Sequence, residues 1–442
     1  MEIKKHISIL GGGPGGLALG YYAKKKGMPF TIFEAKDRIG GNCITFAWRD
    51  FRLDSGAHRF HDKDSEMTAT IKSLLGDDLV LINVPSNIYH HGKMIDFPLS
   101  PINLFNKLGP ITFVKAGMQV LFSRFQSKTK EDNFENFALR TYGRIIAEKF
   151  LLNYSQKLWG APCNKLSTNI AGTRLKGLNL KSFLAEAFLG KKAKTTHVEG
   201  ASFYYPRRGI ATISEKLGEF CGSENISLNR KITKIRHDGN KIRTIEMNGA
   251  EEIAVQEVVS TLPLDYFLDI MDPQPPQEIV ALKKELRYRN MVLVAVFLEQ
   301  NSVTSAATVY FPDDDFHFTR IYEPKNRFVH MAPPGKTHLV AEIPCQPEDI
   351  YWKMPDHELI DSVIAKLKAI DWITQETIIG SSVYRLENAY PILETGFEQK
   401  VERINGYLAN FSNLNLSGRN GKFKYSWIHD MMRFGKTIID KF

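Results

Sequence analysis

The sequence has few cysteines, and they stand far apart. Its 442 residues include only Cys43, Cys163, Cys221 and Cys345, and no two of them form a CxxC pair. This spacing excludes a disulfide framework and argues against a zinc site built from cysteines. A reducing compartment suits such a chain, and the N-terminus runs directly into a predicted strand rather than a signal peptide. We therefore expect a cytoplasmic protein.

Long apolar runs, internal repeats and low-complexity tracts are also missing. No stretch reaches the roughly 18 uncharged apolar residues of a transmembrane helix, so none is expected. The 43% hydrophobic and 24% charged residues exclude a disordered or collagen-like chain. Lysine and arginine exceed the acids by 58 to 49, which favours an anionic small-molecule substrate or contact with an anionic membrane surface. No basic and aromatic recognition motif accompanies this excess, so nucleic acid is not an expected partner.

The strongest signal is a glycine-rich loop near the N-terminus. Residues 6–10 and 28–33 read as short buried strands, and 17–26 reads as the helix between them. A strand, a glycine loop, a helix and a second strand that ends in an acid are typical of a dinucleotide site. The loop contains Gly11, Gly13, Pro14, Gly15 and Gly16.

Each part of this unit has a physical role in the predicted site. Gly11 permits a tight turn, Gly13 lets a pyrophosphate approach the backbone, and Gly16 lets the helix pack closely on the sheet. The N–H groups of the helix N-terminus then face the phosphates. Glu34 accepts hydrogen bonds from ribose hydroxyls and disfavours a 2′-phosphate, so NADP is the poorer choice.

A second glycine motif indicates which dinucleotide is bound. Ala35 begins a short spacer, Gly40-Gly41-Asn42 follows it, and residues 56–61 read Gly-Ala-His-Arg-Phe-His. An acid, a spacer and a glycine pair resemble the FAD-binding signature of the amine oxidase and protoporphyrinogen oxidase superfamily. Asn42 departs from the arginine of many amine oxidases. The triplet together with residues 56–61 is similar to the UDP-galactopyranose mutases and their oxidoreductase relatives.

The resemblance continues in the same order through residues 91–103, 150–160, 318–323, 389–391 and 418–425. It implies FAD as the cofactor and an α/β fold, in which a Rossmann-like FAD-binding domain with a parallel sheet and a β-meander is interleaved with an α+β substrate domain. The FAD-binding domain would comprise 1–65, 198–268 and 395–442, and the substrate domain 66–197 and 269–394. The expected cofactor-binding residues are Gly11, Gly13, Pro14, Gly15, Gly16, Glu34, Ala35, Gly40, Gly41, Asn42, Ile232, Thr261, Gly418 and Arg419.

The residue pattern itself predicts several elements. Alternation and turn signals predict the β-meander over 226–259, and a further strand and helix are expected at 414–416 and 427–441. The apolar helix of 109–125 packs either in the core of the substrate domain, which we favour, or on a membrane surface. The substrate domain should contain helices at 65–75, 111–126, 133–152, 180–188 and 357–369 and strands at 292–298, 307–311, 328–332 and 337–343.

Six residues are candidates for the catalytic site on the substrate side. Arginine offers a planar fork of donors to phosphate or carboxylate, although it also serves in structural ion pairs. Tyrosine hydroxyls can bind phosphate oxygens, or the rings can simply be packed. A tryptophan at a helix end can stack on a base or lie in the core, and a loop histidine near the flavin can contact it or be structural. The candidates are Arg174, Arg320, Tyr390, Tyr425, Trp159 and His58.

No metal site is predicted. His90 and His91 have no third ligand at a metal-like spacing, and Asp313-Asp314-Asp315 reads as a solvated turn. No Ser-His-Asp or Cys-His order and no paired acids are recognisable either. Chemistry carried by a cofactor fits this pattern.

Two functions follow from the resemblance. The first is an FAD-dependent oxidoreductase, in which a hydride passes from the substrate to flavin N5, with cell-surface polysaccharide or lipopolysaccharide synthesis as one setting. The second is a mutase-like flavoenzyme that isomerises a nucleotide sugar with reduced FAD and no net redox change. In the mutase, Arg174, Arg320, Tyr390 and Tyr425 would hold the diphosphate and Trp159 would lie near the base.

Overall fold

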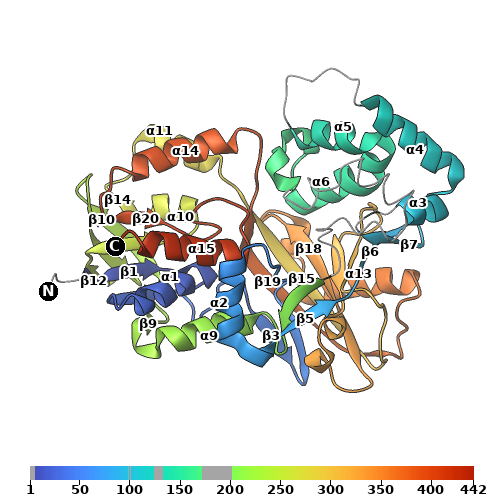
Figure 1. The fold of residues 1–442 in the computed structure, drawn as a ribbon, viewed down its shortest axis with the longest axis horizontal. Coiled ribbons are helices and arrows are strands. Elements are labelled where there is room, and N and C mark those ends of the chain that lie inside the picture. Colours follow the sequence, from blue (N-terminus) through green and yellow to red (C-terminus); the bar gives the residue numbers. More distant parts are fainter. Residues whose placement is uncertain (1–4, 98, 100, 124–132, 172–201) are drawn as a thin grey trace.

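The structure is a computed structural model that describes residues 5–97, 99, 101–123, 133–171 and 202–442. A five-stranded parallel sheet lies at the centre of one half of the molecule, on the left in Figure 1. Its central strand is fully buried and pairs in parallel with a neighbour on each side, as expected for a sheet covered by helices on its faces. The strand order is β20 (Leu414–Leu416), β13 (Glu257–Ser260), β1 (Ile7–Leu10), β2 (Phe30–Phe33) and β9 (Ile226–Ser227).

The predicted β-meander forms a second, four-stranded sheet in the same half. Three of its strands are antiparallel neighbours in chain order, which confirms the prediction for the middle of 226–259. The two ends of that range belong instead to the parallel sheet, as β9 and β13. The strand order is β12 (Glu251–Ala254), β11 (Ile242–Met247), β10 (Ile232–His237) and β14 (Met271–Asp272).

The other half, on the right in Figure 1, is built on a seven-stranded sheet. Two of these strands, β15 and β18, are buried along their whole length and pair antiparallel with each other. The order is β19 (Ile378–Pro391), β15 (Tyr288–Leu298), β18 (Thr337–Cys345), β17 (Arg320–Tyr322), β16 (Thr308–Tyr310), β6 (Ser86–His90) and β7 (Lys93–Phe97). Two smaller ladders pair β3 (Thr45–Trp48) with β4 (Phe51–Asp54) and β5 (Leu79–Asn83) with β8 (Ser202–Pro206).

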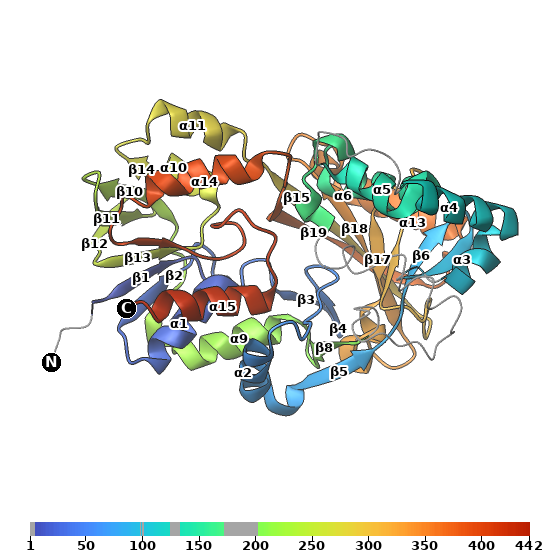
Figure 2. The ribbon, with the colours of Figure 1, turned by 45° about the horizontal axis from the view of Figure 1, so that its top comes forward.

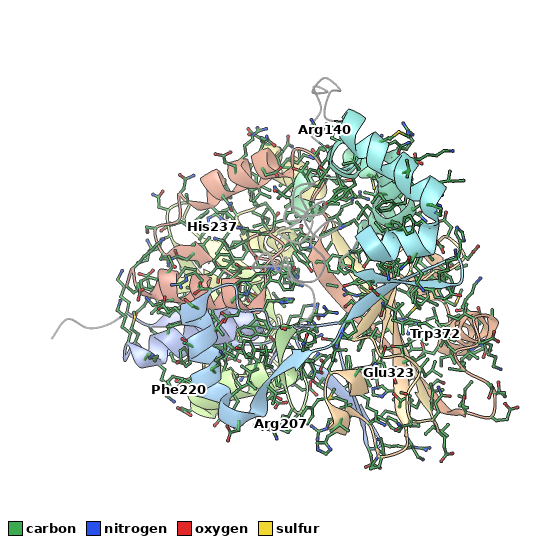
Figure 3. All side chains as sticks on the ribbon, turned by 45° about the vertical axis from the view of Figure 1, so that its right-hand side comes forward. Arg140, Arg207, Phe220, His237, Glu323 and Trp372 are labelled. Carbon is green, nitrogen blue, oxygen red and sulfur yellow. The ribbon has the colours of Figure 1, made fainter. Side chains whose placement is uncertain are left out.

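Helices cover both halves. The C-terminal helix α15 lies beside α1, and a separate helical group of α3 to α6 stands over the large sheet (Figures 1 and 2). In Figure 3, Phe220 and His237 mark the half with the parallel sheet, and Glu323 and Trp372 mark the other half. The helices are α1 (Pro14–Lys25), α2 (Ser65–Leu75), α3 (Pro101–Leu108), α4 (Pro110–Ser123), α5 (Phe134–Ile146), α6 (Asn153–Trp159), α9 (Ala211–Cys221), α10 (Leu264–Asp269), α11 (Gln277–Lys284), α12 (Ile350–Lys353), α13 (Asp356–Ala369), α14 (Phe397–Leu408) and α15 (Ile428–Ile439).

Most predicted elements are present, and three predictions are wrong in part. Residues 329–331 form a short helical turn where a strand was predicted over 328–332, because two prolines follow the apolar run. The segment after 66 contains β5, β6 and β7 in addition to its helices. The predicted helix of 133–152 ends as α5 at Ile146 and continues as a π-helical turn, and the helix predicted over 180–188 lies outside the described residues.

The helix α4 does not pack as a core helix on all sides. Its residues Ile111, Val114 and Met118 share one face and are 72%, 55% and 47% exposed, whereas Ala116 on another face is buried. This corrects the preference for a core helix, and membrane contact by this face stays a prediction. Within the described part of the chain, no helix is both long and apolar enough to span a bilayer.

We keep the division into two interleaved domains as a proposal. All strands of the parallel sheet come from the three segments expected to bind FAD. However, β8 of the expected FAD-binding domain pairs with β5 of the expected substrate domain. Likewise, β14 of the expected substrate domain pairs with β10 of the expected FAD-binding domain.

Candidate active site

Three loop segments, two of them with glycine, meet at the carboxyl ends of the parallel strands. Gly11 follows β1, Thr261 follows β13, and Gly418 follows β20. In open α/β sheets this edge is where ligands bind, because the loops there leave a crevice between strand ends and helix N-termini. The helix that starts here, α1, has no side-chain cap and no acid in its first turn. Its N-terminus therefore has a positive dipole end that no acidic side chain of that turn compensates.

The close approach of these segments requires glycine. A Cβ on Gly16 would lie 1.9 Å from the carbonyl oxygen of Gly11, and one on Gly15 would lie 2.9 Å from the Cα of Gly418. A Cβ on Gly41 would lie 3.1 Å from the Cα of Gly13. By contrast, a Cβ on Gly13 would meet only the Cα of Gly41 at 3.8 Å, an ordinary contact. We call Gly11–Gly16, Gly40–Gly41 and Gly418 the glycine cradle.

Glu34 closes the cradle on the side of β2. Its side chain is buried, with Oε2 accepting from the Gly12 amide at 2.7 Å and Oε1 from the Lys36 amide at 2.9 Å. Each carboxylate oxygen has a second lone pair, so both can still accept from a ribose hydroxyl. This arrangement fits the role expected of Glu34.

Three further residues expected to bind the cofactor have different positions. Thr261 touches the cradle, since its hydroxyl donates to the Leu10 carbonyl at 2.8 Å. Ile232 has its side chain in the core, and its carbonyl accepts from Tyr266. Ile232 lies near Glu34, because the amide of Arg230, two residues earlier, donates to the Glu34 carbonyl. Since the Ile232 side chain is buried in the core, only its backbone can face a ligand there. Ala35 is exposed beside Glu34.

Asn42, Arg419 and Asn420 hold three successive carbonyls at the end of β19. They donate to the carbonyl oxygens of residues 387, 389 and 388 at 2.8, 3.1 and 2.8 Å, respectively. These bonds tie the cradle loops to the strand that carries Tyr390. Asn42 thus contacts the protein backbone here, and Asn420 keeps its buried Oδ1 without a hydrogen bond among the described residues. Such an orphaned acceptor fits a donor from a bound cofactor.

Arg419 brings a positive charge to this junction. Its Nε and Nη2 donate to the Ser426 carbonyl at 3.0 and 2.8 Å, and it forms no ion pair with a described acid. The guanidinium lies 5.1 Å from the centre of the Tyr425 ring. Because only carbonyl dipoles balance it, its charge remains available to an anion at the cradle.

A cavity of about 1010 Å³ opens against the C-terminal segment that follows Gly418, and none of its described lining residues belongs to the cradle itself. It lies between α6, the β16–β17 pair, α14 and the C-terminal segment that follows Gly418. Of the six predicted catalytic residues, Trp159, Arg320 and Tyr425 line it. Tyr390 lies directly behind the wall, with its ring 5.4 Å from Trp159 and 6.3 Å from Tyr425, centre to centre. The fold therefore brings four of the six together.

Arg320 is held in the cavity by a fully buried acid. Its Nε donates to Oε2 of Glu342, which is 0% exposed, and Oε1 of Glu342 accepts from the Ala57 amide at 2.6 Å. Burial opposes the charge, but Glu342 and the neighbouring hydroxyl of Tyr154 still hold the pKa of Arg320 well above its usual range. The terminal nitrogens of Arg320 have no hydrogen bond within the described residues.

Tyr390 supplies a second donor beside this guanidinium. Its hydroxyl is buried and forms no hydrogen bond within the described part of the chain. Burial raises the pKa of Tyr390, so the hydroxyl keeps its proton. A buried, unpartnered O–H is costly unless a ligand bonds to it, and the half-buried guanidinium of Arg320 keeps terminal donors free beside it.

His58 lies between the cradle and the cavity but does not line the cavity. Its Nε2 is 3.1 Å from the Ser55 hydroxyl, which itself donates to the Asn42 carbonyl at 2.5 Å. Burial, followed by the charges of Arg419 and Arg320, lowers the pKa of His58 to about 3. The ring is therefore neutral at physiological pH and serves as a hydrogen-bonding group rather than a proton acceptor.

Sequence reasoning missed Glu342 and the role of Asn420, and Arg174 lies outside the described residues. Glu342 sits within an apolar strand, and only its burial marks it as a partner of a charged group. Asn420 was visible in the Gly-Arg-Asn-Gly motif, but its role depends on a carbonyl 32 residues away.

Comparison with known proteins places the chain in a family. The model of the family "flavin containing amine oxidoreductase" matches residues 14–377. Coproporphyrinogen III oxidase of Bacillus subtilis is 22% identical, over 99% of this chain and 97% of its own. A crystal structure of reduced UDP-galactopyranose mutase is similar in fold, with a TM-score of 0.86 and 20% identity over 99% of this chain and 95% of the other. A putative protoporphyrinogen oxidase from Exiguobacterium sp. 255-15 has a TM-score of 0.80 and 18% identity over 100% and 99%.

The described residues fit FAD, the cofactor implied by that match. The cradle has room for a pyrophosphate at Gly13, Glu34 has free lone pairs for a ribose, and Asn420 has an open acceptor. The uncapped end of α1 and the charge of Arg419 favour the anionic parts of the molecule.

Proposed function

Since the chain belongs to the flavin containing amine oxidoreductase family, we propose that it oxidises a small anionic substrate bound in the cavity that Arg320 lines. FAD, when bound, supplies the hydride acceptor. The protein contributes binding, orientation and charge, which suits a site without recognisable nucleophile or paired acids.

The observation that carries this proposal is the pair of unused donors at Arg320 and Tyr390. Arg320 is cationic and can only donate, whereas the protonated Tyr390 hydroxyl can donate as well as accept. A carboxylate or phosphate would accept from both and relieve their unsatisfied burial. A neutral or cationic substrate would leave the terminal nitrogens of Arg320 without an acceptor beyond the Glu342 pair at Nε, so the donors favour an anion.

The aromatic wall would place the rest of the substrate. Trp159, Tyr390 and Tyr425 form a cluster with all ring centres within 6.3 Å of one another. Flat rings in such a cluster exclude water and present faces to an unsaturated or ring-shaped ligand. The hydrogen bonds from Asn42, Arg419 and Asn420 to the end of β19 would keep Tyr390 in register with the cradle.

The mutase remains the second candidate. One observation favours it: an arginine and an unpartnered tyrosine lie beside a tryptophan at the wall, an arrangement that suits a nucleoside diphosphate, with the phosphates at Arg320 and the base at Trp159. The two functions differ in whether the flavin changes its redox state over one turnover.

The test follows the flavin and the product together. FAD-loaded protein is mixed without oxygen with coproporphyrinogen III or with UDP-galactofuranose, in the oxidised and the dithionite-reduced state. Oxidation predicts that an anionic substrate bleaches the oxidised flavin. The mutase predicts UDP-galactopyranose, detected by HPLC, from the reduced protein alone.

Two variants connect the result to the site. Arg320→Met should slow the active reaction at least about tenfold, which is the effect of losing one charge-assisted hydrogen bond worth roughly 1.5–3 kcal/mol. The matched control is Arg385→Met, since Arg385 on β19 bonds Asp356 and the backbone outside the cavity. Equal rates for both variants, or flavin bleaching by cationic amines only, would contradict the proposed anion site.

A further inference from the structure

A cluster of two histidines and an aspartate lies outside the site described above. Asp313 Oδ1 is 2.6 Å from His90 Nδ1, and Oδ2 is 3.8 Å from His91 Nδ1. The three potential ligand atoms all lie within 4.8 Å of one another. The third ligand, which the spacing of His90 and His91 does not provide, comes from the loop after β16. Asp313 is buried, which corrects the expectation of a fully solvated acidic turn.

The backbone turns both imidazoles to the same side. Successive residues of a strand face opposite ways, and His90 belongs to the buried face of β6. His91 and Gly92 form the two-residue turn into β7, with φ of 46° and 76°. The positive φ, which histidine adopts more often than most residues other than glycine, brings the two ring centres within 4.2 Å. Asparagine is the usual residue at this turn position.

The distances suit a small metal ion. Zinc binds imidazole nitrogen and carboxylate oxygen at about 2.0–2.2 Å in tetrahedral sites, which puts the ligand atoms about 3.3 Å apart. Without an ion, His90 Nδ1 and Asp313 Oδ1 are hydrogen-bonded at 2.6 Å, and Oδ2 accepts from the His91 amide at 3.0 Å. His90 Nδ1 would move away from Oδ1 to admit the ion, and His91 Nδ1, 3.8 Å from Oδ2, would move closer. The His91 side chain is 69% exposed, which leaves a route for the ion and a place for a water ligand.

The surroundings balance the charge of a dication. Asp314 and Asp315 follow Asp313 and are exposed. The nearby cation Lys157 is turned to the backbone of this loop, since its Nζ donates to the carbonyls of residues 311, 313 and 316 at 2.8, 2.7 and 2.9 Å. Those bonds also fix the loop that carries Asp313. Positioned ligands of this kind make a metal site tighter.

We propose that His90, His91 and Asp313 form a binding site for a divalent transition-metal ion such as Zn²⁺, completed by water. Imidazole and carboxylate are ligands that such ions accept. The ion joins the β6–β7 hairpin to the loop after β16. Ile88 and Phe97 of the hairpin and Pro312 of the loop all line the large cavity, so the ion stabilises one wall of that cavity.

The test uses untagged, metal-free full-length protein titrated with zinc chloride. Calorimetry should give one zinc per chain, and zinc should raise the melting temperature. Cobalt(II) should give the visible absorption bands of a tetrahedral site. The key variant is His91→Asn, because asparagine followed by glycine suits the turn and should keep the metal-free fold intact. It should weaken zinc binding at least about tenfold.

Two further variants separate this site from adventitious binding. Asp313→Asn should weaken zinc as His91→Asn does. His357→Asn is the matched control, since His357 on α13 is exposed and outside the cluster, and it should bind zinc like the wild type. The proposal is overturned if the wild type takes up no zinc at submillimolar concentration, or if His91→Asn binds it as tightly as the wild type.

Discussion

Substituting Gly13 by alanine should separate cofactor binding from folding. The residue has φ −73° and ψ 178°, which alanine adopts without strain. The added Cβ would meet the protein only at the Gly41 Cα, 3.8 Å away. Lower chain entropy in the unfolded state stabilises such a variant by about 0.4–1 kcal/mol, and the poorer N-cap offsets a similar amount. The free energy of unfolding without FAD should therefore change by less than about 1 kcal/mol.

The same methyl group should impair FAD binding. It projects into the space that the pyrophosphate requires, and overpacking of this kind costs roughly 1–3 kcal/mol. At about 1.4 kcal/mol per factor of ten, the Kd for FAD should rise between roughly 5- and 150-fold. Titration of the metal-free, flavin-free protein with FAD, followed by flavin fluorescence, measures the Kd, and urea unfolding measures stability.

Two other glycines provide the controls. Gly16→Ala would place a Cβ 1.9 Å from the Gly11 carbonyl oxygen, so it should cost about 3 kcal/mol or more in stability itself. Gly406→Ala on α14 meets nothing within 4 Å and should stabilise the helix by up to about 1 kcal/mol with unchanged FAD affinity. Wild-type affinity in Gly13→Ala would refute the reasoning, because the pyrophosphate could not then pass over Gly13.

Three further predictions concern charge and burial. Arg320→Met leaves Glu342 buried without its ion-pair partner and should lower the free energy of unfolding by about 3–5 kcal/mol. The double variant Arg320→Met/Glu342→Gln should regain part of this stability, and urea unfolding measures both variants. Because the pKa of folded His58 is about 3, only the unfolded chain binds its proton between about pH 6.5 and 4. Stability should fall on acidification there, and His58→Gln should make that slope shallower by up to about 1.4 kcal/mol per pH unit in unfolding at varied pH. All four cysteines are buried and unpaired, and burial raises the pKa of each to about 12, so Ellman's reagent should label them only in denaturant.

The elements that could be predicted carry strong local signals. Apolar periodicity and an adjoining glycine turn mark the strand and helix around Gly11–Gly16. The same two signals mark the strand at Leu414–Leu416, which Gly418 follows. β19 could not be predicted in this way. Its sequence mixes glycine, serine and asparagine, and its order comes from pairing with β15, which is buried throughout.

Local sequence determined the cofactor end of this protein, because a tight turn, a helix N-terminus and an acid at a strand end all act within about thirty residues. Only the tertiary structure decided the substrate end. Arg320 depends on Glu342 across a strand pair, and Tyr390 depends on bonds from Asn42 and Arg419. The third ligand for His90 and His91 likewise comes from 223 residues away in the chain. Such pairs are set by sheet register and loop packing, whose energies depend on the whole fold and leave no periodic pattern in the chain.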